Sequence, residues 1–253
     1  MDIRIIVAAH KPYKMPKGDI YLPLHVGAQG KDSIGFTPDN TGDNISEKNP
    51  NYCELTGLYW AWKNLDAQFI GLAHYRRHFS NGRLCRDKWK RVISKAELEK
   101  KLTEYPVLLP TPRNYWIETS YTQYAHAHHA KDLDLTREIL AEKYPDYLPA
   151  FDKVMGLTIG HRFNMFIMKK SYFDRWCEWL FDVLFTLEER LDISGYSQND
   201  ARVFGFVAER LLDVWLITSR VKYKDIPYVF MEKQNWLKKG GGFVKRKLGA
   251  NKK

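Results

Sequence analysis

The sequence predicts an α/β fold with a mixed, mostly parallel central sheet flanked by helices. Short apolar runs rich in β-branched residues alternate with longer segments whose apolar residues recur at helical spacing, as in strand–helix units. The chain has 253 residues, 44% hydrophobic and 28% charged, which is ordinary globular composition and enough length for one large core. We expect one domain over residues 1–232 and a basic, aromatic tail over 233–253.

The first two strands lie on either side of a long irregular segment. Ile3–Ala9 is a nearly continuous apolar run, which predicts a buried parallel strand. Residues 13–50 are rich in Gly, Pro, Asp and Asn without a sustained period, so we expect a long loop that is functional or mobile. A helix is then expected from Pro50 or Asn51, followed by a strand over Phe69–Ala73.

Helices and short strands alternate over the remainder. Apolar spacing predicts helices at Lys95–Glu104, Thr119–Ala130, Asp134–Lys143 (capped by Asp132 or Asp134), Ser171–Arg190 (capped by Ser171) and Asp200–Ser219. Apolar runs predict strands at Val107–Leu109, Phe163–Met168 and Tyr228–Phe230. Neither an internal repeat nor a linker interrupts this alternation before residue 233.

Positive charge is concentrated in the tail. The chain carries +10, and residues 233–253 hold eight Lys or Arg and no acid, so residues 1–232 carry only +2. A near-neutral body argues against a nucleic-acid-binding surface across the domain. Bulky apolar residues among the tail's lysines suit an anionic membrane surface, although a disordered solubilising tail has a similar composition.

Nothing in the sequence indicates export or membrane insertion. The cysteines, Cys53, Cys85 and Cys177, form neither a disulfide framework nor metal-ligand spacing, as is typical of a reduced cytosolic protein. The N-terminal apolar run is too short for a signal peptide, and no window reaches the roughly 18 apolar residues of a transmembrane helix. We therefore expect a cytoplasmic protein, held peripherally at the inner face of the plasma membrane by its tail.

The strongest functional signal follows the strand expected at Phe69–Ala73. That strand ends in five consecutive polar side chains: His74, Tyr75, Arg76, Arg77 and His78. Convergent cationic groups at a strand end are typical of a ligand site in an α/β protein, and the planar forks of two arginines suit the oxygens of a diphosphate. An edge strand closed by solvated charges is the structural alternative.

A second polar group precedes the first helix and comprises Asp43, Asn44, Ser46, Lys48, Asn49 and Glu54. Short polar side chains around one lysine suit ribose hydroxyls and phosphate at a helix N-terminus. The same residue types dominate ordinary turns for conformational reasons. This segment alone does not distinguish the two interpretations.

Further candidates lie in the second half of the chain. His126, His128 and His129 precede Asp132, and His128 and Asp132 share a helix face four residues apart. That spacing permits a metal site but favours substrate binding, because neither a zinc-protease motif nor a cysteine is near. Asn164 interrupts an apolar run and must find hydrogen-bond partners, either a substrate hydroxyl or a neighbouring loop.

The segment that begins at Asp200 offers two carboxylates. Asp200 stands at an expected helix start, where the helix dipole favours negative charge. Arg202 and Glu209 lie two turns apart on one helix face, and Glu209 falls among apolar neighbours, so it needs a partner. The two form a structural ion pair, or Glu209 binds substrate or takes part in catalysis.

Common catalytic motifs are absent. The chain has no Walker phosphate loop, no GxGxxG, no GxSxG, no HExxH and no DxD at a strand end. Kinase, dehydrogenase, serine hydrolase and zinc protease functions therefore lack support.

Several blocks resemble, in order, the bacterial family of domains of unknown function numbered 4422, found among capsular and exopolysaccharide glycosyltransferases. The blocks are ISEKNPNYCELTGLYWAWKN, GLAHYRRHF, NMFIMKKSYF, WCEWLFDVL and RVFGFVAERL, and they span about residues 3–230. The resemblance implies a single GT-A-like (Rossmann-like) domain. It also implies transfer of a hexosyl group, first galactofuranose or galactose, from a UDP-sugar to a growing, lipid-linked capsular or exopolysaccharide glycan.

The resemblance also implies roles for the candidate residues. Nucleotide-sugar binding falls to Ala8, His10, Asp43, Asn44, Lys48, Asn49, His74, Tyr75, Arg76 and Arg77, and acceptor binding to His128, Asn164 and Arg202. In an inverting enzyme the base on the acceptor hydroxyl would be Asp200 or, second, Glu209.

The resemblance further suggests a divalent cation, Mn or Mg, at the diphosphate. Because His74-Tyr75-Arg76 stands where such folds usually carry a DxD, we name no metal ligand and expect cationic side chains to neutralise the leaving diphosphate.

Three other functions remain open. They are a non-catalytic nucleotide-sugar or glycan-binding module, a nucleic-acid-binding protein that uses the tail, and a histidine-based metallohydrolase. The near-neutral body argues against the second. The expected partners are a UDP-sugar donor, a glycan acceptor and an anionic membrane surface, with no nucleic acid.

Overall fold

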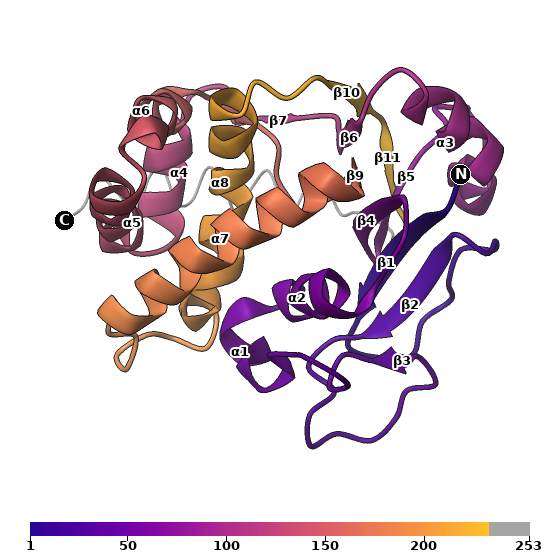
Figure 1. The fold of residues 1–253 in the computed structure, drawn as a ribbon, viewed down its shortest axis with the longest axis horizontal. Coiled ribbons are helices and arrows are strands. Elements are labelled where there is room, and N and C mark those ends of the chain that lie inside the picture. Colours follow the sequence, from indigo (N-terminus) through magenta and orange to yellow (C-terminus); the bar gives the residue numbers. More distant parts are fainter. Residues whose placement is uncertain (233–253) are drawn as a thin grey trace.

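The computed structural model describes residues 1–232, and the tail expected at 233–253 lies outside the described residues. Its central sheet has nine strands in the order β10-β6-β9-β4-β1-β2-β3, with β5 paired to β4 and β11 (Figure 1). The strands are β1 (Ile3–Ala9), β2 (Tyr21–His25), β3 (Thr37–Pro38), β4 (Phe69–His74), β5 (Arg77–Phe79), β6 (Val107–Pro110), β9 (Phe166–Lys169), β10 (Tyr223–Ile226) and β11 (Tyr228–Phe230). A separate two-stranded sheet joins β7 (Arg113–Asn114) to β8 (Ile159–Gly160).

Most neighbouring strands are parallel. β1 pairs in parallel with β2 and β4, β2 with β3, and β6 with β10. β9 is inserted antiparallel between β4 and β6, and β5 is antiparallel to β4 and β11. This mixed, mostly parallel sheet with flanking helices confirms the predicted fold class.

Helices cover both faces of the sheet. α2 and α7 lie against one face and α3 against the other, while α4, α5 and α6 pack beside α7 and α8, away from β2 and β3 (Figure 1). The helices are α1 (Asn49–Tyr52), α2 (Leu55–Asn64), α3 (Lys95–Leu102), α4 (Ser120–Ala127), α5 (Ala130–Lys143), α6 (Leu148–Gly156), α7 (Lys170–Arg190) and α8 (Val203–Thr218). Short 3-10 turns are η1 (Ser46–Lys48), η2 (Lys88–Arg91), η3 (Pro145–Tyr147) and η4 (Asp200–Arg202). No helix among residues 1–232 has the length and apolarity needed to cross a bilayer.

Alternation along β1 contributes to two hydrophobic cores. Ile6 and Ala8 pack into the larger core with α2, α7 and α8, whereas Ile5 and Val7 pack into the smaller core with Leu98 of α3. Burial of an Ile or Val side chain stabilises the fold by about 1.5–3 kcal/mol. The apolar residues of β1, all of them buried, therefore favour its place at the centre of the sheet.

Strand predictions are confirmed at both ends of the described chain, since β1 and β11 have the predicted bounds. The loop expected over residues 13–50 is wrong in part, because this segment contains β2 and β3. Pro23 lies inside β2 opposite Val7 of β1. Proline rarely occurs within a strand that is paired on both sides, which explains why the sequence did not indicate this strand.

Two predicted elements are interrupted by left-handed backbone. The helix expected from Pro50 or Asn51 is split into α1 and α2, because Cys53 has φ 53°. The strand expected over Phe163–Met168 begins only at Phe166, because Phe163 and Asn164 have φ values of 84° and 50°. Asn164 therefore lies in a turn and not in a strand.

The predicted caps of α5 and α7 are also wrong. His129 and Lys169 stand at the two N-cap positions, and neither makes a side-chain capping bond. Asp132 is instead fully buried and accepts hydrogen bonds from the hydroxyls of Tyr124 and Tyr196. Its carboxylate thus joins α4 and α5 to the segment before α8.

A buried carboxylate orders the segment that was expected to be a loop. Asp39 is fully buried and accepts bonds from the backbone N–H groups of Gly27 and Ala28, at 2.8 and 3.0 Å. It also accepts from the hydroxyls of Ser46 and Thr56. These four bonds tie the ends of β2, η1 and α2 together, which explains why residues 13–50 are structured.

Asp39→Ala should destabilise the protein by at least about 3 kcal/mol, because four buried donors lose one shared acceptor. Urea unfolding measures this free energy. Asp32→Ala, at an exposed position in the same segment, is the matched control and should change stability by no more than about 0.5 kcal/mol. Equal effects of the two substitutions would contradict the role of Asp39.

Candidate functional site

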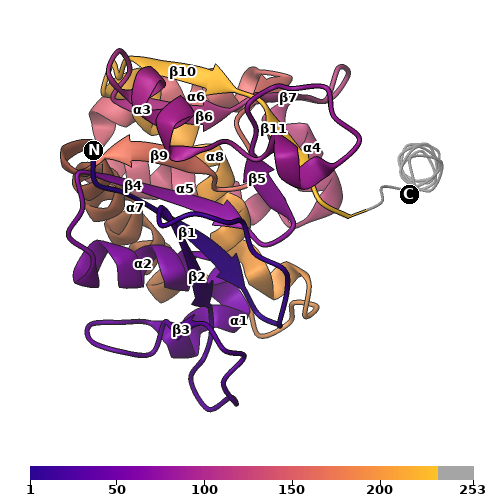
Figure 2. The same ribbon diagram turned by 90° about the vertical axis from the view of Figure 1, so that its right-hand side faces the viewer.

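The carboxyl ends of β1 and β4 form one edge of the sheet. Ala8 pairs with His74, so the two strands end level with each other. β9 begins opposite Leu72 and runs the other way, which brings the residues before it to the same edge. Figure 2 shows the arrows of β1 and β4 pointing toward the side where β5 and β11 lie. Ligands of α/β sheets bind beyond such an edge.

Backbone strain marks the same place. Three non-glycine residues with positive φ lie at this edge: Cys53, Phe163 and Asn164. Cys53 directly precedes Glu54, which accepts a bond from Asn164, and the Phe163 carbonyl contacts His74. Non-glycine residues in this region cost of order 1–3 kcal/mol each and gather at functional sites. Both interruptions of predicted elements therefore fall at one site.

Glu54 is the central side chain of this site. Its Oε1 accepts a 2.8 Å bond from Asn164 Nδ2 and lies 4.0 Å from His74 Nε2. Asn164 also donates to the carbonyl of Gly205 in α8 (3.1 Å), and His74 Nε2 lies 2.5 Å from the carbonyl of Phe163. Because a carbonyl only accepts, Nε2 of His74 carries the proton. Glu54 thus joins α2, β4, the turn before β9 and α8.

Glu209 and Arg77 extend the site toward α8 and β5. Burial lowers the pKa of the Arg77 guanidinium, and Glu209 is the largest influence that opposes this shift. The guanidinium lies 3.6 Å from the Phe163 ring centre. Glu209 Oε2 accepts a 3.0 Å bond from Arg210, which in turn donates to Gln123 of α4 at 2.7 Å. Of the two alternatives for Glu209, an ion pair with Arg202 is not formed, and its ion pair is with Arg210.

A group of cations surrounds His10, just beyond β1. Burial and then Lys11, Arg76, Lys31 and Arg202 lower the pKa of this histidine. Lys11 Nζ and the Arg76 guanidinium lie 5.6 and 5.1 Å from the Tyr75 ring centre. Arg76 pairs with Glu232 (3.6 Å), while no ion pair within residues 1–232 involves Lys11, Lys31 or Arg202. Three of these four cations therefore have no ion pair within residues 1–232.

Arg202 connects the cation group to Glu54. Its Nε donates to Cys53 Sγ at 3.0 Å, and Cys53 directly precedes Glu54. Burial and Glu54 raise the pKa of the Cys53 thiol to about 11, so the thiol is neutral near pH 7. Arg202, expected on the acceptor side, thus lies between the cation group and the carboxylates.

Asp200 and His128 form a pair beside the site. Asp200 Oδ1 lies 3.1 Å from His128 Nδ1, and bonds from Ser197 and His128 lower the pKa of Asp200. Burial lowers the pKa of His128, whose ring stacks on Phe206 at 4.2 Å. The Arg202 guanidinium lies 5.3 Å from the same Phe206 ring. The pair therefore borders the region occupied by Arg202.

Two residues expected at the nucleotide lie elsewhere. The carbonyl of Asp43 accepts from Asn64, the last residue of α2, and the Asn44 side chain bonds within its own turn. Since the ten residues of α2 span about 15 Å, neither lies beside Glu54 at the start of that helix. The bonds of Asp43 and Asn44 stabilise a turn, and their assignment to the nucleotide stays a prediction.

Lys48 and Asn49 support the backbone around Cys53. Lys48 Nζ pairs with Glu188 of α7 at 2.8 Å, and Asn49 Nδ2 donates to the Cys53 carbonyl at 2.7 Å. His74 and Arg77 are also turned inward, so Arg76 is the one exposed residue of the three expected at the diphosphate. The sequence did not single out Cys53, because its strained backbone has no signature in composition or spacing.

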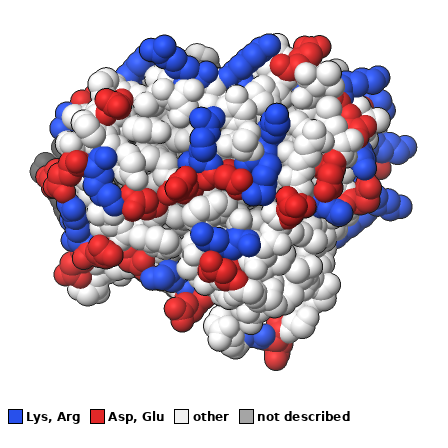
Figure 3. Space-filling model, in the orientation of Figure 1, with Lys and Arg blue, Asp and Glu red and all other residues white. Residues whose placement is uncertain are grey.

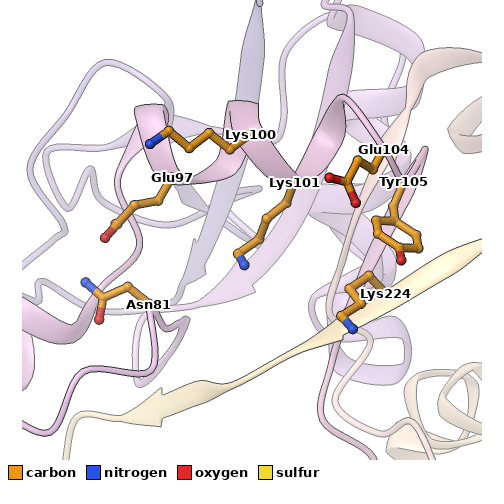
Figure 4. Close-up of a pocket in the computed structure, with 7 residues that line it drawn as sticks. All are labelled: Asn81, Glu97, Lys100, Lys101, Glu104, Tyr105 and Lys224. Atoms are coloured by element: carbon orange, nitrogen blue, oxygen red, sulfur yellow. The ribbon is translucent and has the colours of Figure 1, made fainter.

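The described residues contain no group of three or more His, Cys, Asp or Glu side chains arranged to hold a metal ion. A cavity of about 390 Å³ lies apart from the site, between α3, β10 and the segment after β5. Its lining includes Lys101, Tyr105 and Lys224 (Figure 4). None of the site residues described above lines that cavity.

Comparison with known proteins identifies the family. The family model for a domain of unknown function, DUF4422, matches residues 4–220. The chain belongs to the DUF4422 family. This confirms the resemblance seen in the sequence, and no curated protein matches the chain.

A solved structure described as the WbbM bifunctional glycosyltransferase, in its apo form, is similar to the DUF4422 chain. The TM-score is 0.84 at 31% sequence identity, over 92% of this chain and 46% of that one. The DUF4422 chain therefore spans about half the length of this structural relative.

Behind the site, charged bonds hold the turn that contains Phe163 and Asn164 in the DUF4422 chain. His161 is buried, with Nδ1 2.5 Å from Asp213 and Nε2 2.9 Å from Asp225. Burial lowers the pKa of His161, but the bonds to Asp213 and Asp225 outweigh burial and raise it to about 9. His161 is thus an imidazolium that donates from both nitrogens to α8 and β10.

Stability should therefore decrease at alkaline pH through His161. With a folded pKa near 9 and an unfolded value of about 6.5, the stabilisation is complete below about pH 6.5 and is lost as pH rises through 9. The difference in unfolding free energy between wild type and His161→Asn should shrink by up to about 3 kcal/mol over that range. Urea unfolding at several pH values measures it, and a pH-independent difference would refute the imidazolium assignment.

Proposed function

We propose that this chain is a glycosyltransferase that uses a nucleotide-sugar donor. One observation carries the proposal: four cations, of which only Arg76 has an ion pair within residues 1–232, lie near His10 at the carboxyl edge of β1 and adjoin the carboxylates Glu54 and Glu209. A diphosphate needs fixed positive charge as it departs, and a sugar needs nearby acceptors and donors for its hydroxyls. The similarity to a bifunctional glycosyltransferase supports this reading.

The donor diphosphate is assigned to the cation group. Lys11, Lys31, Arg76 and Arg202 supply the charge, and Ala8, His10 and Tyr75 line the approach at the strand ends. Such a surface does not fit a divalent cation, since cations repel it and the strand end has His74-Tyr75-Arg76 where a DxD would stand. No step is therefore assigned to a metal.

The donor sugar is assigned to Glu54, Asn164 and Glu209. A hexose hydroxyl can donate to either carboxylate, and the Asn164 amide is oriented by Glu54 and the Gly205 carbonyl. His74 contacts the Phe163 carbonyl and the Glu54 carboxylate through Nε2, so it is a positioning residue for Glu54. Galactose or galactofuranose carried by UDP is the first donor to test, as the family resemblance implies.

The acceptor is assigned to the side of His128 and Asp200. In an inverting transfer a base removes the proton of the acceptor hydroxyl as the glycosidic bond forms and the nucleoside diphosphate leaves. The lowered pKa of His128 keeps its imidazole neutral near pH 7. Because Nδ1 of this imidazole donates its hydrogen to Asp200, the other nitrogen, Nε2, is free to accept the proton of the acceptor hydroxyl. A lipid-linked capsular or exopolysaccharide glycan, held at the inner membrane face, is the acceptor class we assign.

A non-catalytic module that binds a nucleotide sugar is the second candidate, because the cation group alone would suffice for binding. Turnover separates the two. The module would be stabilised by UDP-galactose and would release no UDP when a glycan acceptor is added, whereas the transferase would release UDP.

Two substitutions should affect different steps of the reaction. Arg202→Gln should raise the dissociation constant for UDP about tenfold or more, because it removes a charge from the diphosphate site. Asp200→Asn should lower kcat about 10²-fold or more with little change in UDP binding, because it disrupts the base. Calorimetry measures binding, and coupled UDP release measures turnover, with and without Mn and chelator.

Arg175→Gln is the matched control, since Arg175 is exposed on α7 and has no ion pair within residues 1–232. It should leave both quantities unchanged. If wild type binds UDP but no UDP-sugar and acceptor pair gives turnover, the transferase proposal fails. If Arg202→Gln binds UDP as tightly as the control, the diphosphate assignment fails.

A further inference from the structure

The described chain ends beside the proposed donor site. Lys88 Nζ donates to three consecutive carbonyls, those of Phe230, Met231 and Glu232, at 2.8, 3.2 and 2.9 Å. The N–H of Met231 donates to the Arg76 carbonyl, and the Glu232 carboxylate pairs with the Arg76 guanidinium. The last described residue is thus fixed to the turn between β4 and β5.

A basic surface lies next to this point. We call the segments Lys14–Lys17 and Arg83–Arg91 the basic rim. They contain seven Lys or Arg and one Asp, a net +6, although residues 1–232 together carry only +2. The remaining 219 described residues therefore carry −4, and the near-neutral total conceals a strongly basic patch.

The two segments form one surface. Lys14 Nζ lies 4.9 Å from the ring centre of Trp89, and both segments line a cavity of about 350 Å³. That volume is within the range of about 300–1,000 Å³ typical of small-molecule sites. Figure 3 views the face that carries α2 and α7, where acidic and basic side chains are intermingled. The basic rim, with seven cations and one Asp, is unlike that mixture.

Apolar side chains accompany these cations. Leu84 is fully exposed between Arg83 and Arg86, while Met15 and Trp89 line the shared cavity. Cations around an exposed leucine and a half-buried tryptophan are characteristic of surfaces that bind anionic lipid, where headgroups pair with the cations and apolar side chains enter the interface.

We infer that the basic rim docks the folded domain onto an anionic lipid surface. This inference rests on the proposed function and extends it. Arg76 belongs to the proposed donor site and also binds the last described residues, so docking of the basic rim brings the donor site to the lipid surface, where a lipid-linked acceptor is presented. Each Lys or Arg near such a surface strengthens binding about fivefold.

Vesicle binding by the full chain tests this inference. Arg86→Glu with Lys90→Glu reverses two exposed charges of the basic rim that make no ion pair within residues 1–232. This variant should bind phosphatidylserine-containing vesicles at least about tenfold more weakly than wild type. Lys153→Glu with Arg175→Glu makes the same charge change on α6 and α7 and should differ from wild type by less than about threefold. Cosedimentation at fixed salt measures all three proteins.

Leu84→Ser tests the apolar contribution. It should weaken binding to the same vesicles several-fold and leave binding to heparin, a soluble acidic polymer, unchanged, because only lipid buries the leucine. Equal vesicle binding by the rim and control variants would overturn the inference. The inference would also be overturned if the rim variant lost heparin binding and vesicle binding to the same extent while Leu84→Ser changed neither. No sugar nucleotide is present, so failure of the proposed transfer reaction would leave this result unaffected.

Discussion

The hydrogen bond from Asn164 to Glu54 is the contact on which the site depends. It joins residues 110 positions apart, at the start of α2 and before β9. Each partner is fixed by strained backbone, at Cys53 on one side and at Phe163 and Asn164 on the other. Strain of this kind persists only where the surrounding structure over-determines it. The buried Asp39 network and the His161 bonds supply that support from β2, α8 and β10.

Opposite charges are separated along the site. Lys11, Lys31 and Arg76 lie toward β1, the carboxylates of Glu54 and Glu209 lie toward α8, and Arg202 connects the two groups. A nucleotide sugar has a matching polarity, with a dianionic diphosphate at one end and a hydroxyl-rich ring at the other. Under the proposed function, these fixed charges orient such a donor. The same surroundings lower the pKa values of His10 and His74, because desolvation and neighbouring cations both disfavour protonation of these histidines.

Much of the scaffold could be predicted from sequence, because uninterrupted apolar runs have one dominant interpretation. β1 and β11 were predicted to the residue, and β4 to within one residue. The site was predicted less well, because its geometry depends on contacts that spacing does not encode. Asn164 looked like a strand residue, yet its amide needs a turn to reach Glu54. Asp43 and Asn44 looked like ligand residues, although turn chemistry alone accounts for them.

The central claim is that the cations around His10 receive a diphosphate, and the imidazole of His10 reports on it directly. Burial, and then the cations Lys11, Arg76, Lys31 and Arg202, hold the pKa of His10 below its usual range. A bound dianion in their midst should therefore raise that pKa. An NMR titration of the His10 ring, with and without saturating UDP, measures the shift. The account predicts a clear rise in the pKa when UDP binds, and an unchanged titration with UDP bound would contradict it.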